Sequence, residues 1–202
     1  LIDQLAATCP LWGNDGEILA RVRDPWQLRQ ALAGGEIHLP EMRRTPDGLP
    51  NDGSWLVKSH RGSSGSGVRS WDATASPPAG DEILQRRVAG EAIAATCVGN
   101  RSNAVVLGVT RQLVGTNWTG AAPFQYAGSI GPYACSPDLH REIERTAKVL
   151  AHQFRLAGLF GLDLVVCDDH AWLLEINPRY TASVEIIERL TGVAAIAAHH
   201  AA

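Results

Sequence analysis

Residues 160–177 read FGLDLVVCDDHAWLLEIN, two apolar segments joined by a short polar turn. Aliphatic and β-branched side chains bounded by polar residues predict two strands of an antiparallel hairpin. If residues 168–170 form the loop, the strands are expected to pair as follows: Cys167 with Ala171, Val165 with Leu173, and Asp163 with Glu175. Two carboxylates are then expected to face each other across the hairpin.

The opposed carboxylates predict a metal site. Directly opposed like charges destabilise a sheet, whereas Mg²⁺ prefers a site built only from oxygen ligands. Strand alternation places Glu175 and Asn177 on one face, and Leu174 and Ile176 on the other. The alternative is an acidic strand edge exposed to solvent, but the apolar flanks favour a pair that lines a cleft. We therefore predict that Asp163, Glu175 and Asn177 bind magnesium.

Arg179 follows this strand, just beyond Pro178, where the strand must end. Its guanidinium could reach a phosphate or carboxylate held at the metal and bind it with two parallel hydrogen bonds. The alternative for a single arginine is an ion pair on the surface.

A second constellation lies at residues 55–68, WLVKSHRGSSGSGV, where a predicted strand carries Lys58 into a loop of small residues. Small residues let backbone N–H groups approach phosphate oxygens, and the lysine supplies positive charge. The loop lies between strands and does not open a helix, so neither a P-loop nor a dinucleotide fingerprint fits. The alternative is a flexible hairpin loop with an exposed lysine. The candidate phosphate-binding residues are Lys58, Gly62, Ser63, Ser64, Gly65, Ser66 and Gly67.

The rest of the chain predicts alternating helical and β regions. Asp24 is expected to cap a helix that begins at Pro25. A second helix is expected over residues 137–156, ended by Gly158, and further helices from about residues 181 and 193. Short strands that read as an antiparallel sheet are expected at 54–58, 67–71, 82–88, 92–98 and 103–114.

Composition excludes several classes of partner. The chain has 202 residues, 45% of them hydrophobic, and a net charge of −3 without a basic stripe, which argues against nucleic acid. No apolar run reaches the roughly 20 residues that cross a bilayer, so a cytoplasmic protein is expected. Cysteine spacing shows no zinc pair, and reduced core thiols are expected, with a catalytic cysteine as the alternative. The cysteines are Cys9, Cys97, Cys135 and Cys167.

Four segments in this order resemble the ATP-grasp superfamily: WLVKSHRGSSGSGV, QRRVAGE, GLFGLDLVV and LLEINPR. Three more, GNDGEILARVRDPW, FQYAGSIGP and EINPRYTASVEI, look closest to ATP-grasp proteins of tetrahydromethanopterin-linked C1 metabolism, relatives of tyramine-glutamate ligase. The resemblance spans nearly the whole chain. It implies an α+β fold in which two α+β lobes hold ATP between them.

The resemblance also implies an organisation of the chain. Residues 15–88 would form the small lobe with the glycine-rich loop, and residues 89–202 the large lobe with the metal site. The N-terminal domain that precedes these lobes in the superfamily is expected to be absent, with residues 1–14 as the end of its last helix. Two features depart from the family: the stretch at residues 23–28, RDPWQL, offers no first ATP-binding lysine, and Ser59 stands where proline is usual.

Roles for individual residues follow from the same resemblance. Lys58 and the glycine loop would hold the ATP phosphates, and Gln85 to Val88, including Arg86, would form the hinge against adenine, with Val88 offering its backbone. Glu91 would contact the ribose, although its spacing is one residue short. Two Mg²⁺ ions, or Mn²⁺ in their place, would bind Asp163, Glu175 and Asn177. Arg179 would steady the transferred phosphoryl group, and Arg111 would contact the substrate.

The implied reaction is activation of a carboxylate as an acyl phosphate, followed by attack of an amine and release of ADP and phosphate. Lys58 and Arg179 are the catalytic candidates. The expected partners are a small carboxylate and an amine, with no nucleic acid or membrane, and a homodimer is compatible with the sequence. Two alternatives stay open: a nucleotide-binding regulatory module without turnover, and a small-molecule kinase.

Overall fold

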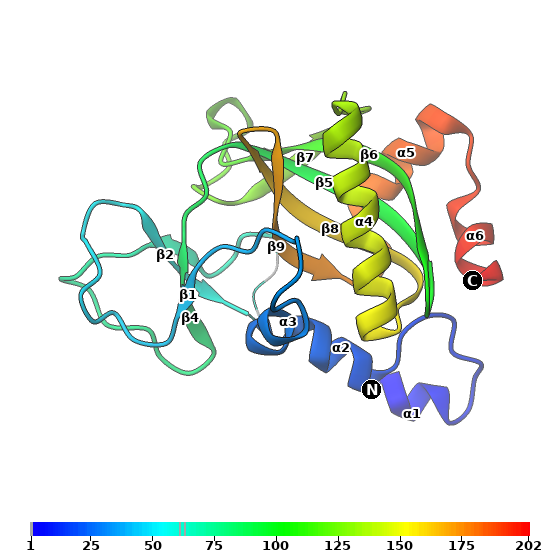
Figure 1. The fold of residues 1–202 in the computed structure, drawn as a ribbon, viewed down its shortest axis with the longest axis horizontal. Coiled ribbons are helices and arrows are strands. Elements are labelled where there is room, and N and C mark those ends of the chain that lie inside the picture. The colour runs from blue at the N-terminus through cyan, green and yellow to red at the C-terminus, as the bar shows by residue number, and fades with distance from the viewer. Residues whose placement is uncertain (1, 61, 63) are drawn as a thin grey trace.

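The computed structural model describes residues 2–60, 62 and 64–202, and its strands form two antiparallel sheets (Figure 1). The smaller sheet has four strands in the order β1-β4-β2-β3. Trp55, Val57, Trp71 and Leu84 form a small core of its own. Its strands are β1 (Met42–Arg43), β2 (Trp55–Ser59), β3 (Val68–Ser70) and β4 (Glu82–Arg86).

The larger sheet has five strands in the order β7-β6-β5-β8-β9. The five expected strands are antiparallel, as predicted. They do not form one sheet, because the first three belong to the small sheet and the last two to the large one. Hydrophobic alternation identifies a strand but not its partner. The strands are β5 (Glu91–Asn100), β6 (Ala104–Val114), β7 (Tyr126–Ile130), β8 (Ala157–Cys167) and β9 (His170–Asn177).

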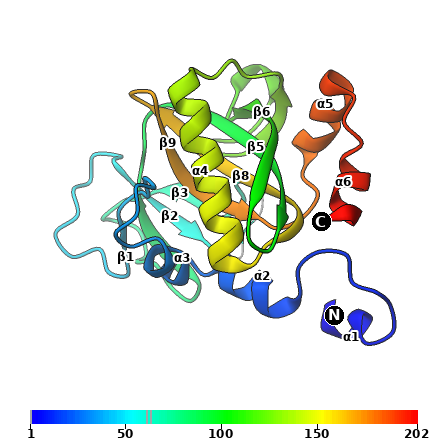
Figure 2. The same cartoon turned by 45° about the vertical axis from the view of Figure 1, so that its right-hand side comes forward.

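Helix α4 (Pro137–Phe154) lies along one face of the large sheet, with α2 (Gly16–Arg23) and α3 (Pro25–Ala31) beside it (Figure 2). The Asp24 side chain accepts hydrogen bonds from two N–H groups of α3, which confirms the predicted cap. Helix α4 ends earlier than predicted, because Arg155 adopts the left-handed conformation. Gly158 instead lies in β8.

Helices α5 (Ala182–Thr191) and α6 (Ala195–Ala201) cover part of the opposite face, through Val98, Leu159 and Val184. They begin within two residues of the predicted positions. The other end of this face, around Asp163, lies open toward the small sheet. The short helix α1 (Ile2–Ala6) and the 3-10 turn η1 (Asn117–Thr119) complete the described elements.

The β8–β9 hairpin reaches the predicted carboxylate pairing by a different route. Its loop has only two residues, Asp168 and Asp169, both with positive φ, as tight hairpin turns require. The predicted pairs Cys167 with Ala171 and Val165 with Leu173 are therefore wrong. The register shifts between Asp163 and Leu164, which restores the predicted pairing of Asp163 with Glu175. The observed pairs nearer the turn are Cys167 with His170, Val166 with Ala171, Val165 with Trp172, and Leu164 with Leu173.

This irregularity also changes which β9 residues face the core. Leu173 and Ile176 are buried, whereas Leu174 is half-buried and lines the cleft beside Glu175. The expected shared face of Leu174 and Ile176 is thus wrong, because the extra residue breaks the strict alternation.

The cysteines differ from the expected set of core thiols. All four are free, but only Cys97 is buried; Cys135 and Cys167 are half-buried, and Cys9 is exposed. Among the described residues, no helix has both the length and the apolar character needed to cross a membrane.

Candidate active site

A cleft of about 980 Å³ lies between the two sheets, near the upper end of the roughly 300–1,000 Å³ usual for small-molecule pockets. Residues from both sheets line it, so the tertiary structure brings together two motifs that are far apart in sequence. The predicted site residues that line it are Lys58, Gly62, Ser64, Gly65, Ser66, Gln85, Arg86, Val88, Glu91, Arg111, Asp163, Glu175, Asn177 and Arg179.

Two predicted loop residues are not among these lining residues. Gly67 lies at the base of the loop, where its carbonyl accepts a hydrogen bond from the Ser59 N–H at 3.3 Å. Ser63 lies outside the described residues.

Asp163 lies at the floor of the cleft, and both of its carboxylate oxygens accept hydrogen bonds. Gln112 donates to Oδ1 and Asn177 donates to Oδ2, each at 2.9 Å. Burial raises the pKa of the Asp163 carboxyl and the Glu175 carboxylate raises it further, while the two hydrogen bonds oppose this shift. The two amides therefore hold Asp163 in place at a site where a cation would favour its charged form.

Gln112 was not predicted. It lies on β6, and its only sequence signal is a polar side chain within an otherwise largely apolar strand. Nothing in the sequence places that strand two positions away from β8 in the sheet.

Lys58 connects the two sheets at the cleft. Its ammonium lies 3.5 Å from Glu175 Oε2 and donates to the Leu174 carbonyl at 3.3 Å. The lysine side chain is only 17% exposed, so this is not the exposed lysine of a surface hairpin. Glu175 thus faces both a like charge and a cation, and the lysine offsets part of the repulsion from Asp163.

The residues present fit a hard divalent cation. Asp163, Glu175 and Asn177 offer oxygen atoms alone, and the Lys58 ammonium beside Glu175 shows that positive charge is favoured there. Asn177 donates to Asp163 through its nitrogen and accepts from the Arg179 guanidinium through Oδ1 at 3.1 Å. A metal bound by Oδ1 would therefore compete with Arg179 for the same oxygen.

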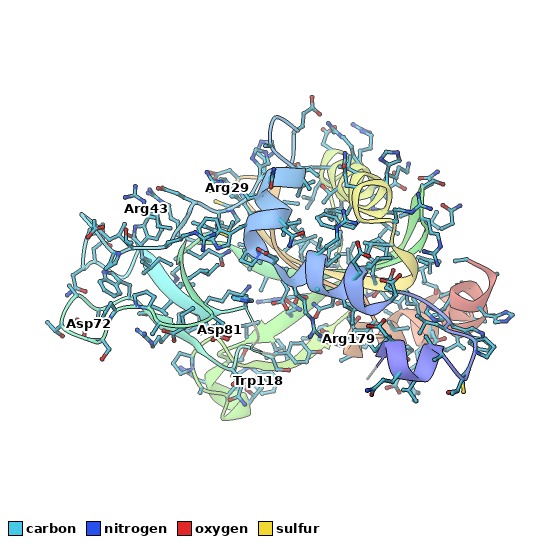
Figure 3. The ribbon with its side chains drawn as sticks, turned by 90° about the horizontal axis from the view of Figure 1, so that it is seen from below. Arg29, Arg43, Asp72, Asp81, Trp118 and Arg179 are labelled. Carbon is cyan, nitrogen blue, oxygen red and sulfur yellow. The ribbon has the colours of Figure 1, made fainter. Side chains whose placement is uncertain are left out.

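Arg179 lies at the mouth of the cleft and is exposed. Figure 3 shows it on the same side of the molecule as Trp118, which belongs to η1 and also lines the cleft. Besides Asn177, Arg179 donates to the Tyr180 carbonyl at 3.1 Å. Its guanidinium is accessible to an anionic group.

Glu91 and Arg111 bond to each other. Arg111 Nε lies 2.8 Å from Glu91 Oε1, and both side chains are partly exposed at the cleft wall. The sequence resemblance implies a ribose contact for Glu91 and a substrate contact for Arg111. Each of these contacts would have to compete with this ion pair.

The glycine loop packs against the connection between β6 and β7, which belongs to the large sheet. The Tyr126 N–H donates to the Ser64 carbonyl at 3.1 Å. Gly65 has φ +80°, and a Cβ there would lie 1.9 Å from the Phe124 carbonyl oxygen. Arg87, which belongs to the predicted hinge segment 85–88, lies over the Phe124 ring, with its guanidinium carbon 5.9 Å from the ring centroid. The contact between loop and connection therefore depends on the absence of a side chain at Gly65.

A Gly65→Ala substitution is expected to raise the apparent Kd for MgATP about tenfold or more. The new methyl group forces the loop away from Phe124, and a left-handed alanine costs a further 1–2 kcal/mol or so. Gly80→Ala is the matched control, because Gly80 also has positive φ (+63°) but open space around its Cβ. Nucleotide titration of both variants checks this, and equal affinities in the two would contradict it.

Comparison with known proteins identifies the family. Residues 22–183, well over half of the chain, match the model of the ATP-grasp domain. The chain belongs to the ATP-grasp family.

The ATP-grasp relatives are distant. The carbamoyl phosphate synthase large chain of Neisseria gonorrhoeae is 29% identical over 96 residues, which cover 48% of this chain and 9% of that protein. A structure of an ATP-grasp superfamily protein from Archaeoglobus fulgidus superposes with a TM-score of 0.75 at 22% identity, covering 99% of this chain and 59% of that one.

A third comparison includes a bound nucleotide. The biotin carboxylase domain of Hydrogenobacter thermophilus 2-oxoglutarate carboxylase, crystallised with MgADP and bicarbonate, has a TM-score of 0.76 at 13% identity, covering 97% of this chain and 48% of that one. At these identities the structures show the fold, which confirms the predicted ATP-grasp α+β architecture. The chain spans less than two thirds of the length of each of these relatives.

Proposed function

We propose that this ATP-grasp chain activates a carboxylate as an acyl phosphate, which an amine then attacks to form an amide bond. The observation that carries the proposal is the meeting of Lys58 with Glu175 at 3.5 Å, in a cleft that also holds the glycine loop and Asp163. Phosphate-binding and metal-binding groups from two lobes thereby converge on one point, as transfer of a terminal phosphoryl group requires.

In this proposal each part of the cleft has a separate task. Lys58 and the backbone N–H groups of the glycine loop bind the ATP phosphates, and Gln85, Arg86 and Val88 contact the adenine. Asp163, Glu175 and Asn177 would hold Mg²⁺, or Mn²⁺ in its place, and a bound divalent ion would neutralise charge on the phosphates. Gln112 keeps the Asp163 carboxylate oriented through its hydrogen bond.

The carboxylate substrate, which accepts the phosphoryl group, would enter at the cleft mouth. Arg179, with its exposed guanidinium, steadies the transferred phosphoryl group, and Arg111 binds the substrate after exchanging its Glu91 partner. A carboxylate oxygen attacks the γ-phosphorus, ADP leaves, and the amine nitrogen then attacks the acyl carbon and displaces phosphate. No side chain is assigned as a general base.

Further parts of the proposal follow from the sequence resemblance. They are lobes at residues 15–88 and 89–202, kinship with the ATP-grasp proteins of tetrahydromethanopterin-linked C1 metabolism, a cytoplasmic location, and small-molecule partners. Two other functions, a nucleotide-binding module without turnover and a kinase, are retained as outcomes of the tests below.

Nucleotide binding is tested by thermal unfolding. A ligand at about a hundred times its Kd stabilises a protein by roughly 2.7 kcal/mol, so saturating MgATP is expected to raise the melting temperature by several degrees. ATP with EDTA is the control, and a smaller shift is expected because the metal contacts are lost. A folded sample that shows no shift at millimolar MgATP would contradict the nucleotide site.

The reaction is tested by measuring products from the full-length protein with a panel of carboxylates and amines. ADP and phosphate are expected, and only when both acid and amine are present. ADP formed with the acid alone, with phosphate retained on the product, would identify a kinase. Stoichiometric AMP would contradict the acyl phosphate, and binding without any turnover would favour the regulatory module.

A further inference from the structure

A cluster of three metal-ligating side chains lies away from the cleft, where α4 packs on the opposite face of the large sheet. His38 comes from the segment between α3 and β1, Glu142 from α4, and His170 from the start of β9. One ligand atom from each lies within 4.8 Å of the others. The cluster plays no part in the proposed reaction, and a ligand bound there would not depend on that reaction.

The backbone holds all three side chains in position. The His38 carbonyl accepts a hydrogen bond from the Leu173 N–H at 2.9 Å, and residue 38 forms a parallel bridge with Trp172. Glu142 Oε1 accepts from the Ala171 N–H at 3.0 Å, directly beside His170. These bonds tie both histidines and the glutamate to the first residues of β9.

The side chains also point toward one another. His170 Nδ1 lies 3.2 Å from Glu142 Oε2, and His38 Nε2 lies 4.0 Å from Glu142 Oε1. The centroids of the two imidazole rings are 4.9 Å apart. Ligands on a tetrahedral zinc ion lie about 3.3 Å from one another, given bonds of about 2.0–2.1 Å. Because the ligand atoms lie within 4.8 Å of one another, a movement of the partly exposed His38 ring by up to about 1.5 Å would bring them to this spacing.

Among the described residues, the Glu142 carboxylate of the cluster has no lysine or arginine partner. The Glu142 side chain is only 15% exposed. The arginines nearby on α4 pair elsewhere, Arg141 with Asp138 and Arg145 with Glu36. Within the described residues, the partners of the Glu142 carboxylate are therefore the Ala171 N–H group and the two imidazoles.

We propose that His38, Glu142 and His170 bind a divalent transition-metal ion of the zinc class. Two imidazoles and one carboxylate suit Zn²⁺, whereas the cleft, with oxygen ligands alone, suits Mg²⁺. The Ala171 N–H that orients Glu142 acts as an outer-sphere partner of the ion. The ion would join the segment before β1, helix α4 and the strand that carries Glu175, and so would act as a structural clamp.

The test is calorimetric titration of the EDTA-treated, dialysed protein with ZnCl₂, in millimolar Mg²⁺ so that the oxygen site is occupied. One equivalent of Zn²⁺ is expected to bind with micromolar or tighter affinity. His38→Ala, His170→Ala and Glu142→Gln are each expected to weaken binding tenfold or more. Glu142→Gln can still accept the Ala171 hydrogen bond through its amide oxygen, so it should fold even if a histidine variant does not.

Two controls separate this site from others. His140→Ala removes a histidine that pairs with Glu144 on the same helix at 3.7 Å, where the described residues supply no third ligand, and this variant should bind Zn²⁺ normally. Cys167→Ser removes the thiol across the turn from His170 and should also leave affinity unchanged. Absence of Zn²⁺ binding, or equal loss in His140→Ala, would overturn the proposal and leave a histidine–carboxylate hydrogen-bond cluster.

Discussion

Replacing Glu175 by glutamine is expected to lower ADP production by about two orders of magnitude or more. The change removes a charged metal ligand, and loss of one electrostatic contact that stabilises a transition state typically costs about 3 kcal/mol or more. Glutamine has nearly the same size, so the cleft keeps its shape. The measurement is steady-state ADP release from wild type and variant at saturating MgATP and Mg²⁺.

The empty protein should lose little stability in the same variant. Glu175→Gln relieves the repulsion with Asp163, worth some tenths up to about 1 kcal/mol, but it also breaks the ion pair with Lys58, of about the same worth at this exposure. Repulsion from Asp163 acting alone would leave the variant unchanged or slightly stabilised. The structure adds Lys58 as the compensating partner, and a change in melting temperature near zero is now expected.

Glu185→Gln provides the matched control for this experiment. Glu185 is an exposed glutamate on α5 that pairs with Arg189 at 2.8 Å, outside the cleft lining. Its variant should keep full activity. Normal turnover in Glu175→Gln would remove the metal site from the proposed mechanism, and marked destabilisation would show a structural role for Glu175 beyond the Lys58 contact.

Replacing Lys58 by methionine is expected to reduce kcat/KM for MgATP by about a hundredfold or more. Lys58 is the cation that the small sheet delivers to the carboxylate pair, and methionine keeps the apolar length of the side chain while removing the charge. One lost electrostatic contact of about 3 kcal/mol corresponds to roughly two orders of magnitude. MgATP titration and ADP release together separate a binding loss from a catalytic loss.

Lys148→Met is the corresponding control, since Lys148 is the only other lysine of the chain and is exposed on α4. It should bind and turn over MgATP as wild type does. Wild-type kinetics in Lys58→Met would show that Lys58 serves only to join the two sheets of the empty protein through Glu175 and Leu174. That outcome would contradict its assignment to the phosphates.

Much of the candidate site could be predicted because its residues come in short segments with a strong local pattern. The alternation in β9 and its polar turn were enough to place Asp163 opposite Glu175, even though the turn proved shorter than expected. The two-residue loop shifts the pairing by one residue relative to the predicted three-residue loop. The irregularity between Asp163 and Leu164 shifts it back, so the final pair is the predicted one. Turn length and strand irregularities depend on backbone twist, which the apolar pattern does not encode.

What the sequence by itself determined was local: the Asp24 cap, the strand that carries Lys58, the small residues of its loop, and the carboxylate pair. Tertiary structure alone decided which strands share a sheet, and so brought Gln112 to Asp163, Lys58 to Glu175, and Gly65 against Phe124. The histidine cluster was hidden for the same reason, because its three side chains come from separate elements. Periodicity and turn chemistry act over a few residues, whereas these contacts depend on how whole elements pack.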